Sequence, residues 1–232
     1  MLTHDLPMKS SRSSRRRALS PFLVSAVAAI SISSCATRPS AEFDSVASPP
    51  TNPRNVRVRV SLQNRAVYVM EGNRPLLVTP VAIGKPGNET PTGNFVAFNK
   101  IARKRSNTYG FHVRGGDVRP GTHANTPSGS RYVGYPMPCW VEFSPGYGFH
   151  AGSVWPTPRT HGCLRLHPNV APKFFSIVPQ GTPILIARSL PEDATLGKNL
   201  TRPTDYADPD PPASYMITDA AFQDLLGKSL RR

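Results

Sequence analysis

This chain of 232 residues has few acidic residues and few cysteines. Several familiar sequence patterns are absent from it. Fourteen Asp and Glu residues stand against 28 Lys and Arg residues, which gives a formal net charge of +14. No basic run carries interleaved aromatic residues, so the positive charge does not predict sequence-specific nucleic-acid binding. A cationic surface favours contact with anionic polymers or lipid headgroups, although general solubility also accounts for it.

Two more patterns are missing, those of a nucleotide-binding loop and of a membrane-spanning helix. Gly84-Lys85-Pro86-Gly87 lacks the spacing of a Walker A phosphate loop. The apolar stretch 18–32 is too short to span a bilayer comfortably. Proline, in contrast, is abundant: the 26 prolines are about twice the average usage, and they cluster near both ends and in residues 99–138.

The first 34 residues have the composition of an export signal. A basic region, Lys9 to Arg17, precedes the apolar stretch 18–32. The segment ends in Ile32-Ser33-Ser34-Cys35, which resembles a bacterial lipobox, so we expect residues 1–34 to be removed and Cys35 to be lipidated. Ala36 follows instead of an aspartate, which favours the outer membrane. We therefore expect a membrane-anchored lipoprotein of the periplasm, with simple cleavage and secretion as the alternative.

Two segments are predicted to flank one domain, 55–188. Residues 35–54 are rich in Ser, Pro, Thr and Asn without apolar periodicity, which is typical of a flexible tether. Residues 189–232 form a tail that is rich in Pro and Asp and predicted to be irregular up to Ala213. The tail ends in an amphipathic helix, Ala220 to Leu230, that we expect to dock on the domain.

Alternating apolar residues predict that the domain is mainly β. Val56, Val58, Val60 and Leu62 alternate with polar residues, which is the period of a half-buried strand. A short helix, 170–178, is expected with Asn169 as its N-cap. Similar patterns predict further strands at residues 66–70, 76–83, 94–98, 139–143, 147–151 and 182–187.

Residues 99–138 are the largest gap in this pattern. They are rich in Gly, Arg, Ser, Thr and Pro and have little apolar periodicity. A loop of about forty residues inside a compact domain is often a lid or a binding element. Tyr109, His112, Arg114 and Tyr132 are its candidates for contact with a substrate, against the alternative of simple surface packing.

A candidate nucleophile, base and anion site lie close together in the sequence. Cys163 attacks a carbonyl only as its thiolate, and a free cysteine with a pKa of about 8.5 is mostly protonated at neutral pH. His150 and His161 are the nearby bases, and Arg165 adds a positive charge. Gly162 permits a tight turn that leaves the N–H groups of residues 162 and 163 open, as an oxyanion hole requires.

Three other interpretations of these residues stay open. Cys163 also fits an inert, buried small side chain, with the histidines as ordinary polar residues. A disulfide between Cys163 and Cys139 is the second alternative. The third is a metal site made by His150, His161, Cys163 and His167, but their spacing follows no familiar zinc pattern, so we expect no metal.

The same residues resemble the signature of the L,D-transpeptidase family with a YkuD-type catalytic domain. That signature is a histidine, a variable loop and then Ser/Thr-His-Gly-Cys-aliphatic-Arg/Asn, which corresponds here to His150 and Thr160-His161-Gly162-Cys163-Leu164-Arg165. The resemblance runs from about Val56 to Ala187, and it includes Val81–Lys85, Thr90–Phe95 and Gly181–Ile184. Two departures, a short loop before Thr160 and Ala151 in place of the usual glycine, bear on loop geometry and substrate choice.

The resemblance implies a β-sandwich that acts on the peptide stems of the bacterial cell wall and needs no cofactor. Cys163, activated by His150, would attack the carbonyl between the third residue, a diamino acid, and a terminal D-alanine. The carbonyl of Ala151 would orient the ring of His150, and His161 would support the pocket. The residues predicted to contact substrate are Thr160, Arg165 and Tyr132.

The acceptor of the acyl group is open at this stage. An amine acceptor gives a 3→3 cross-link or attachment to another amine, whereas water makes the protein an L,D-carboxypeptidase. A non-catalytic wall-binding lipoprotein of the same fold is a third alternative, which the presence of Cys163, His150 and Gly162 disfavours. We expect the protein to be a monomer.

Overall fold

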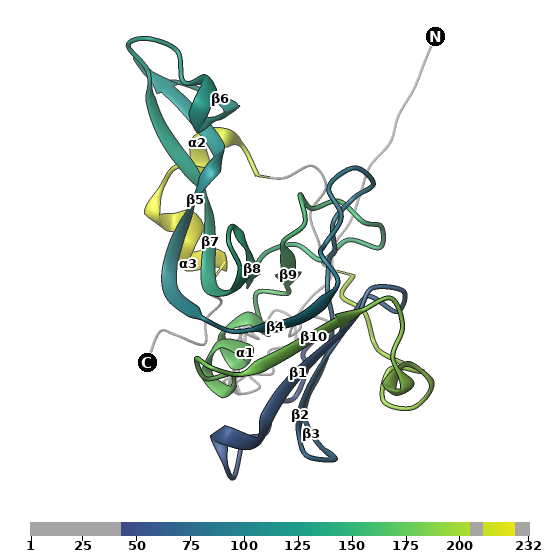
Figure 1. Ribbon diagram of the computed structural model, residues 1–232. Helices are drawn as coiled ribbons and strands as arrows, with labels where there is room; N and C mark the ends of the chain where they lie inside the picture. The colour runs from purple at the N-terminus through teal and green to yellow at the C-terminus, as the bar shows by residue number, and fades with distance from the viewer. Residues whose placement is uncertain (1–42, 205–210, 226–232) are drawn as a thin grey trace, which may run out of the picture. The chain divides into compact units, whose positions relative to one another are not determined.

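Two five-stranded β-sheets and a few short helices make up the protein (Figure 1). The structure is a computed structural model that describes residues 43–204 and 211–225. The prediction of a mainly β fold is confirmed. The predicted export signal and Cys35 lie outside the described residues. No helix in the described part of the chain is long and apolar enough to cross a bilayer.

The first sheet has the strand order β3-β2-β1-β10-β4. Strand β1 pairs antiparallel with β2 and parallel with β10, so that Val58 lies between Val69 and Ile184 on the core face. The strands predicted for this sheet are confirmed, with their ends shifted by a few residues. They are β1 (Val56–Ser61), β2 (Ala66–Glu71), β3 (Arg74–Pro80), β4 (Gly93–Val96) and β10 (Pro183–Ala187).

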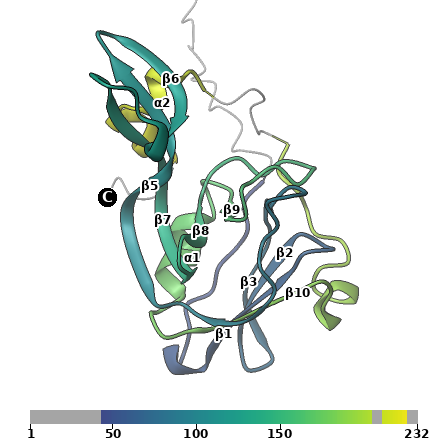
Figure 2. The same ribbon diagram turned by 45° about the horizontal axis from the view of Figure 1, so that its top comes forward.

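The second sheet corrects the prediction of a lid-like loop at residues 99–138. Most of this segment lies in strands of the order β6-β5-β7-β8-β9. Figures 1 and 2 show β5, β6 and β7 extending away from the rest of the sheets. The extended part lies outside the shared core, so its sequence lacks an apolar alternation. The strands are β5 (Asn99–Arg114), β6 (Asp117–Thr122), β7 (Arg131–Ser144), β8 (Tyr147–Ala151) and β9 (Leu164–Leu166).

Side chains from both sheets and one helix share a single core. Val60 of β1 and Phe149 of β8 are fully buried in it, together with Phe174 of helix α1 (Ala171–Ile177). This shared core is what the predicted sandwich requires. The predicted N-cap was wrong: Val170 precedes the helix without a side-chain cap, and the Asn169 side chain donates instead to the Phe43 carbonyl at 3.3 Å.

The structure differs from the predicted tether over residues 43–54. Phe43 is only 2% exposed and packs edge-on against His167, with ring centroids 5.1 Å apart. The Ser48 N–H donates to the Leu76 carbonyl at 2.8 Å. A short 3₁₀ turn, Pro53–Asn55, then leads into β1. These residues belong to the folded domain because a large aromatic side chain anchors them in the core.

The tail is also packed against the domain. Leu190 and Leu200 cover the outer face of the first sheet, next to a 3₁₀ turn, Pro191–Ala194. Asp193 in this turn accepts hydrogen bonds from Tyr68 and Ser61, each at 2.8 Å. Burial, and after it the contact with the Asp193 carboxylate, raises the pKa of Tyr68 to about 12. Residues 190–204, predicted to be irregular, thus stabilise one face of the sheet.

The predicted C-terminal helix begins at Asp219 and docks on the domain, as expected. Helix α2 (Ala213–Met216) packs on β6, and helix α3 (Asp219–Leu225) packs on β7. Met216 and Phe222 are buried at these contacts. The remainder of the predicted helix, 226–230, lies outside the described residues. The extended part of β5, β6 and β7 is therefore packed against the tail and lies outside the core of the domain.

Candidate active site

Strands β8 and β9 place two predicted site residues on one face of the second sheet. Phe149 and Ala151 point into the core, so His150 between them points to the opposite face. In the parallel pairing of the two strands, His150 lies beside Arg165. Neighbouring residues in register share a face of a sheet, so the histidine and the arginine point in the same direction.

Strand β7 continues this face of the sheet. Val141 and Phe143 belong to the core, whereas Trp140 and Glu142 alternate with them and point the other way. The Glu142 carboxylate accepts hydrogen bonds from the Trp140 indole at 3.2 Å and from the Gly146 N–H at 3.1 Å. It thereby holds the turn between β7 and β8 in place.

This face forms the floor of a cavity of about 320 Å³. Five of the predicted site residues line it: His150, Thr160, His161, Cys163 and Arg165. The other lining residues are Lys104, Ser106, Asn107, Thr108, Tyr109, Tyr135, Met137, Trp140, Glu142 and Gly146. We call the side made by residues 160–165 the motif wall, and the side made by residues 104–109 with Tyr135 and Met137 the hairpin wall.

The ring of His150 is held in one orientation. Its Nδ1 lies 2.9 Å from the Ala151 carbonyl oxygen, which only accepts hydrogen bonds, so Nδ1 carries the proton. Nε2 is then left with its lone pair and is able to accept a proton. Burial lowers the pKa of His150 to about 3, the Arg165 charge acts in the same direction, and the bond to Ala151 opposes them. The predicted contact between Ala151 and His150 is thus present.

Cys163 is a free thiol on the motif wall, half-buried, and its sulfur donates to the Gly146 carbonyl at 3.7 Å. Burial raises the pKa of this thiol above its ordinary value. Cys163 and His150 are therefore both neutral at rest, and a proton must pass from sulfur to a base when the sulfur attacks. This arrangement favours transfer of the proton to a neighbouring base during the attack over a thiolate that exists beforehand.

Cys139 is an inert, buried cysteine of the kind that the first alternative interpretation assigned to Cys163. It is 2% exposed, belongs to the core, and forms no disulfide with Cys163. Burial raises the pKa of Cys139 to about 12. The alternative of a bridge between the two cysteines was wrong. His167 of the alternative metal set lines the core next to Phe43 and does not line the cavity.

The loop before Cys163 is closed by the hydroxyl of Thr160. This hydroxyl accepts from the Gly162 N–H at 3.1 Å and donates to the Cys163 carbonyl at 2.6 Å. The prediction that the Gly162 N–H is open for an oxyanion was therefore wrong, and of the predicted pair only the Cys163 N–H remains a candidate. Thr160 lines the cavity, but its hydroxyl works inside the loop and not toward a substrate.

Gly162 is required by the shape of this loop. Its φ is +100°, and a Cβ at this position would lie 2.5 Å from Cε1 of Tyr147. Its carbonyl accepts from the Thr90 hydroxyl at 2.9 Å, and the same hydroxyl accepts from the Gly84 N–H at 3.1 Å. The segments around Gly84 and Thr90, which carry part of the family resemblance, thus hold the motif wall in place through these hydrogen bonds.

Arg165 extends from β9 into the cavity beside two aromatic rings. Its guanidinium carbon lies 4.7 Å from the Trp155 ring centroid and 5.2 Å from that of Tyr135. Two of its nitrogen atoms, Nε and Nη1, are buried without a hydrogen-bond partner among the described residues. A buried guanidinium with unused donors is well suited to bind a carboxylate.

The hairpin wall meets the motif wall where two rings stack. Tyr109 lies flat against His161, with ring centroids 4.3 Å apart. Tyr132, predicted to contact substrate, does not line the cavity; its hydroxyl donates to the Ser106 carbonyl at 3.1 Å, and its ring stacks on His123. Of the two tyrosines in residues 99–138 that were weighed as substrate contacts, Tyr109 therefore lines the cavity and Tyr132 does not.

Several lining residues were missed by the sequence analysis. Trp140 and Glu142 lie in a predicted strand, and their alternation with Val141 was a signal that they face away from the core. Tyr135 and Met137 precede that strand in the segment predicted as a loop, so no pattern placed them. His112 and Arg114, weighed as substrate contacts, lie beyond the cavity on β5.

Residues 55–186, more than half of the chain, match the family described as the L,D-transpeptidase catalytic domain. The chain belongs to this family. Solved L,D-transpeptidases are similar at low identity. The one from Stackebrandtia nassauensis is 19% identical with a TM-score of 0.44, and the comparison covers 62% of this chain and 60% of that one. For the Mycobacterium smegmatis protein these values are 21%, 0.44, 57% and 58%.

A third L,D-transpeptidase, from Enterococcus faecium, is 22% identical with a TM-score of 0.43, and the comparison covers 57% of this chain and 50% of that one. The chain thus spans between half and three fifths of the length of these three proteins. No curated protein matches it. The family assignment accordingly rests on the catalytic domain and leaves the rest of the chain to be understood from its own structure.

Proposed function

We propose that the protein is a cysteine-dependent L,D-transpeptidase that acts on peptidoglycan stem peptides through a thioacyl enzyme. The observation that carries the proposal is the arrangement of His150 and Cys163 on one cavity, with the Ala151 carbonyl fixing the proton on Nδ1 of the histidine. This leaves Nε2 as the proton acceptor. The family match to residues 55–186 supports the same reaction class.

The first half of the reaction forms the thioester. The Cys163 sulfur attacks the carbonyl carbon between the third stem residue and a terminal D-alanine, and its proton passes to Nε2 of His150. The Cys163 N–H is the candidate donor to the oxyanion. When the C–N bond breaks, His150 returns the proton to the leaving amine, and D-alanine departs.

The second half releases the acyl group. An acceptor amine attacks the thioester carbon and loses a proton to His150, and the C–S bond then breaks with return of the proton to sulfur. With water as the acceptor the product is a shortened monomer, which is the carboxypeptidase alternative. The acceptor depends on the shape of the hairpin wall, because the motif wall is occupied by the nucleophile.

We assign Arg165 to a carboxylate of the substrate. Its two unpartnered nitrogens are buried against Trp155 and Tyr135 at the cavity, where a carboxylate would satisfy them. A stem peptide with a diamino acid at its third position carries such a group. The family acts on stem peptides, and the cationic chain suits an anionic cell-wall environment.

The proposal is tested by incubating the protein with purified muropeptides and analysing the products by mass spectrometry. A transpeptidase yields cross-linked dimers and free D-alanine. Shortened monomers without dimers would favour the carboxypeptidase. Intact substrate, with the protein still bound to purified wall, would favour the non-catalytic wall-binding protein.

We further propose that Cys35 anchors the protein to the outer membrane from the periplasmic side. The support is the sequence Ile32-Ser33-Ser34-Cys35 after a basic and an apolar segment. Palmitate labelling should depend on Cys35, and Cys35→Ala should release the protein into the soluble envelope fraction. An unlabelled wild-type protein with Ala36 or a later residue at its N-terminus would show that it is secreted without an anchor.

A further inference from the structure

The hairpin wall is made by an irregularity in strand pairing. Strands β5 and β7 pair regularly up to Arg105, opposite Pro136, and again from Gly110, opposite Gly134. Ser106 to Tyr109 lie between these pairs and face only Tyr135 on the β7 side, so they leave the β5–β7 ladder, although Tyr109 still pairs with Thr122 of β6. All four line the cavity. A bulge of this kind has lost ladder hydrogen bonds to β7, and other contacts hold it, among them the N–H groups of Thr108 and Tyr109, which donate to the Ser106 hydroxyl at 3.2 Å and 3.0 Å.

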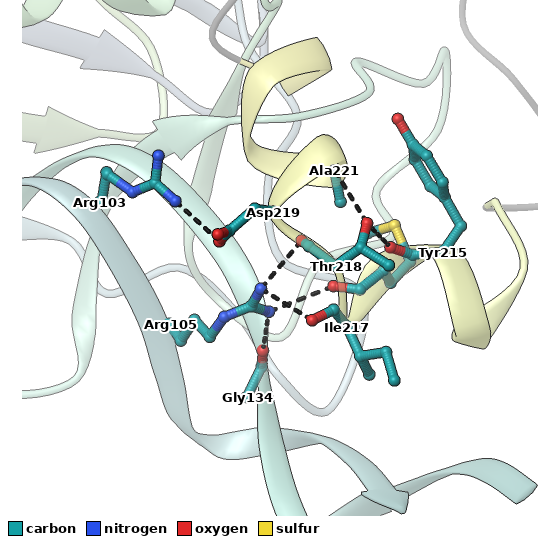
Figure 3. A network of polar contacts seen from close by, with 9 residues as sticks. Arg103, Arg105, Gly134, Tyr215, Ile217, Thr218, Asp219 and Ala221 are labelled. Atoms are coloured by element: carbon teal, nitrogen blue, oxygen red, sulfur yellow. Dashed lines mark hydrogen bonds and ion pairs between the residues drawn. The ribbon is translucent and has the colours of Figure 1, made fainter. Parts of the chain in front are cut away.

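Arg105, the last residue before the bulge, is bound by four backbone carbonyls. Its guanidinium donates across the bulge to the Gly134 carbonyl at 2.9 Å. It also donates to three consecutive carbonyls where helix α2 ends and helix α3 begins, at 3.1–3.2 Å (Figure 3). These belong to Met216, Ile217 and Thr218. Carbonyls at the end of a helix carry partial negative charge, which favours a cation there.

The next outward-facing residue on the same strand makes a second connection to the tail. Arg103 forms an ion pair with Asp219 at 2.8 Å (Figure 3). Both arginines also lie over the ring of Phe222, with guanidinium carbons 4.9 Å and 4.6 Å from its centroid. Phe222 is only 3% exposed. The tail therefore binds the strand through charge, hydrogen bonds and an aromatic ring together.

One side of this contact, the tail, lies outside the family domain. The match to the L,D-transpeptidase catalytic domain ends at residue 186, whereas the helices that bind Arg105 begin at Ala213. Met216 and Ala221 share an apolar cluster with Phe111 of β5, just beyond the bulge. The tail thus contacts the strand on both sides of Ser106–Tyr109, before it through Arg105 and after it through Phe111.

We propose that Arg105 is a positioning residue for substrate binding, through which the C-terminal segment 213–225 holds the Ser106–Tyr109 bulge at the cavity. The bulge carries Tyr109, whose ring stacks on His161 of the motif wall. A bulge released from Arg105 would leave the cysteine chemistry in place and weaken the contact with the stem peptide. The expected loss is in KM and not in kcat. The part of the proposal that concerns KM rests on the proposed function.

The test compares Arg105→Met with Arg119→Met in the full-length protein. Arg119 is an exposed arginine on the neighbouring strand β6 and pairs only with Asp117 in the described residues. Amide hydrogen exchange is measured by mass spectrometry on peptides that cover residues 104–110 and, as a reference, residues 56–71. The second measurement is kcat and KM for stem peptides.

Arg105→Met should accelerate exchange in residues 104–110 and raise KM, each by about tenfold, because several hydrogen bonds to a charged group are lost. Exchange in residues 56–71 and kcat should change less than about threefold, and Arg119→Met should behave as wild type. Arg105→Lys keeps the charge but not the fork of donors, so it should fall between the two. If Arg105→Met does not fold, Arg105→Lys takes its place in the comparison.

Wild-type exchange in residues 104–110 together with wild-type KM in Arg105→Met would overturn the proposal. A fall in kcat with unchanged KM would do so as well, since it would place Arg105 in the chemical step. If the wild-type protein forms no product from stem peptides, the proposed function fails. The exchange comparison still decides then whether Arg105 holds the bulge.

Discussion

The motif wall and the hairpin wall of the cavity are held in place by different means. The motif wall is fixed from within the family domain, by hydrogen bonds between the Thr160 and Thr90 hydroxyls and the backbone of Gly162 and Cys163. The hairpin wall is a bulge outside the core, held by Arg105 and the tail. The two proposals together place the chemistry in the domain and make the contact with substrate depend on a segment beyond it.

The comparison predicts that changes in the motif wall act on turnover, and that changes in the hairpin wall act on substrate binding. The largest effect is expected at the nucleophile. Cys163→Ala should lower kcat at least about a thousandfold, because no other thiol of residues 43–204 and 211–225 lines the cavity. Cys139→Ser, a buried thiol in the core, should keep most activity. Turnover that survives in Cys163→Ala would rule out the mechanism. Loss of turnover on treatment with a chelator would favour the alternative of a metal site.

The next largest effect separates the two histidines. His150→Ala should lower kcat by about a hundredfold or more and slow the alkylation of Cys163 by iodoacetamide near neutral pH, because the proton acceptor is gone. His161→Ala should reduce turnover less and leave alkylation faster than in His150→Ala. The measurement is the alkylation rate against pH in both variants. A rise in the apparent pKa of the thiol in His161→Ala alone would reverse the two roles.

Gly162 tests how rigid the motif wall is. Gly162→Ala should lower the free energy of unfolding by about 1–3 kcal/mol, since the added Cβ meets the Tyr147 ring and the φ is positive. It should also reduce kcat. Gly72→Ala is the matched control, because Gly72 has a φ of +58° but open space around its Cβ. Equal losses in both variants would mean that only backbone strain matters and that the ring contact does not.

The buried imidazole predicts a specific acid sensitivity. The pKa of His150 is lowered from 6.5 to about 3 in the folded protein, chiefly by burial, so below pH 6.5 the unfolded chain binds a proton that the native state excludes. Stability contributed by the neutral ring is therefore complete above pH 6.5 and falls toward pH 3, with a slope of up to about 1.4 kcal/mol per pH unit.

Urea unfolding between pH 6.5 and 5 measures this slope before most carboxylates titrate. The His150→Asn variant should show a shallower dependence, because it removes the titrating ring. An identical slope in the wild type and in His150→Asn would show that His150 is not the group responsible.

The smallest effect is expected on the hairpin wall. Tyr109→Ala removes a stacked ring whose interaction with His161 is of the order of 0.5–1.5 kcal/mol, so KM should rise about threefold to tenfold with kcat nearly unchanged. Tyr132→Ala is the comparison, since Tyr132 lies outside the cavity and contacts it only through the Ser106 carbonyl. A drop in kcat in Tyr109→Ala would erase the distinction between the walls.

The pattern of residues along the chain was enough to predict the strands with clear alternation and the order of the chemical groups. Val56 to Leu62 has the period of a strand, and Val56–Ser61 forms one. The same alternation in Tyr147–Ala151 places His150 opposite the core, and the segment Thr160–Arg165 supplies the loop and the cysteine. Local periodicity is enough here because one face of each strand is buried in a single core.

The hairpin, the bulge and the contacts of the tail could not be predicted from local patterns, because they depend on packing between distant segments. Residues 99–138 lack apolar alternation because their strands extend beyond the core, and the choice of Tyr109 over Tyr132 follows from a slip in register between β5 and β7. The burial of Phe43 and the four carbonyls around Arg105 are likewise non-local. Such contacts join residues far apart in the chain, so the pattern within one segment does not predict them.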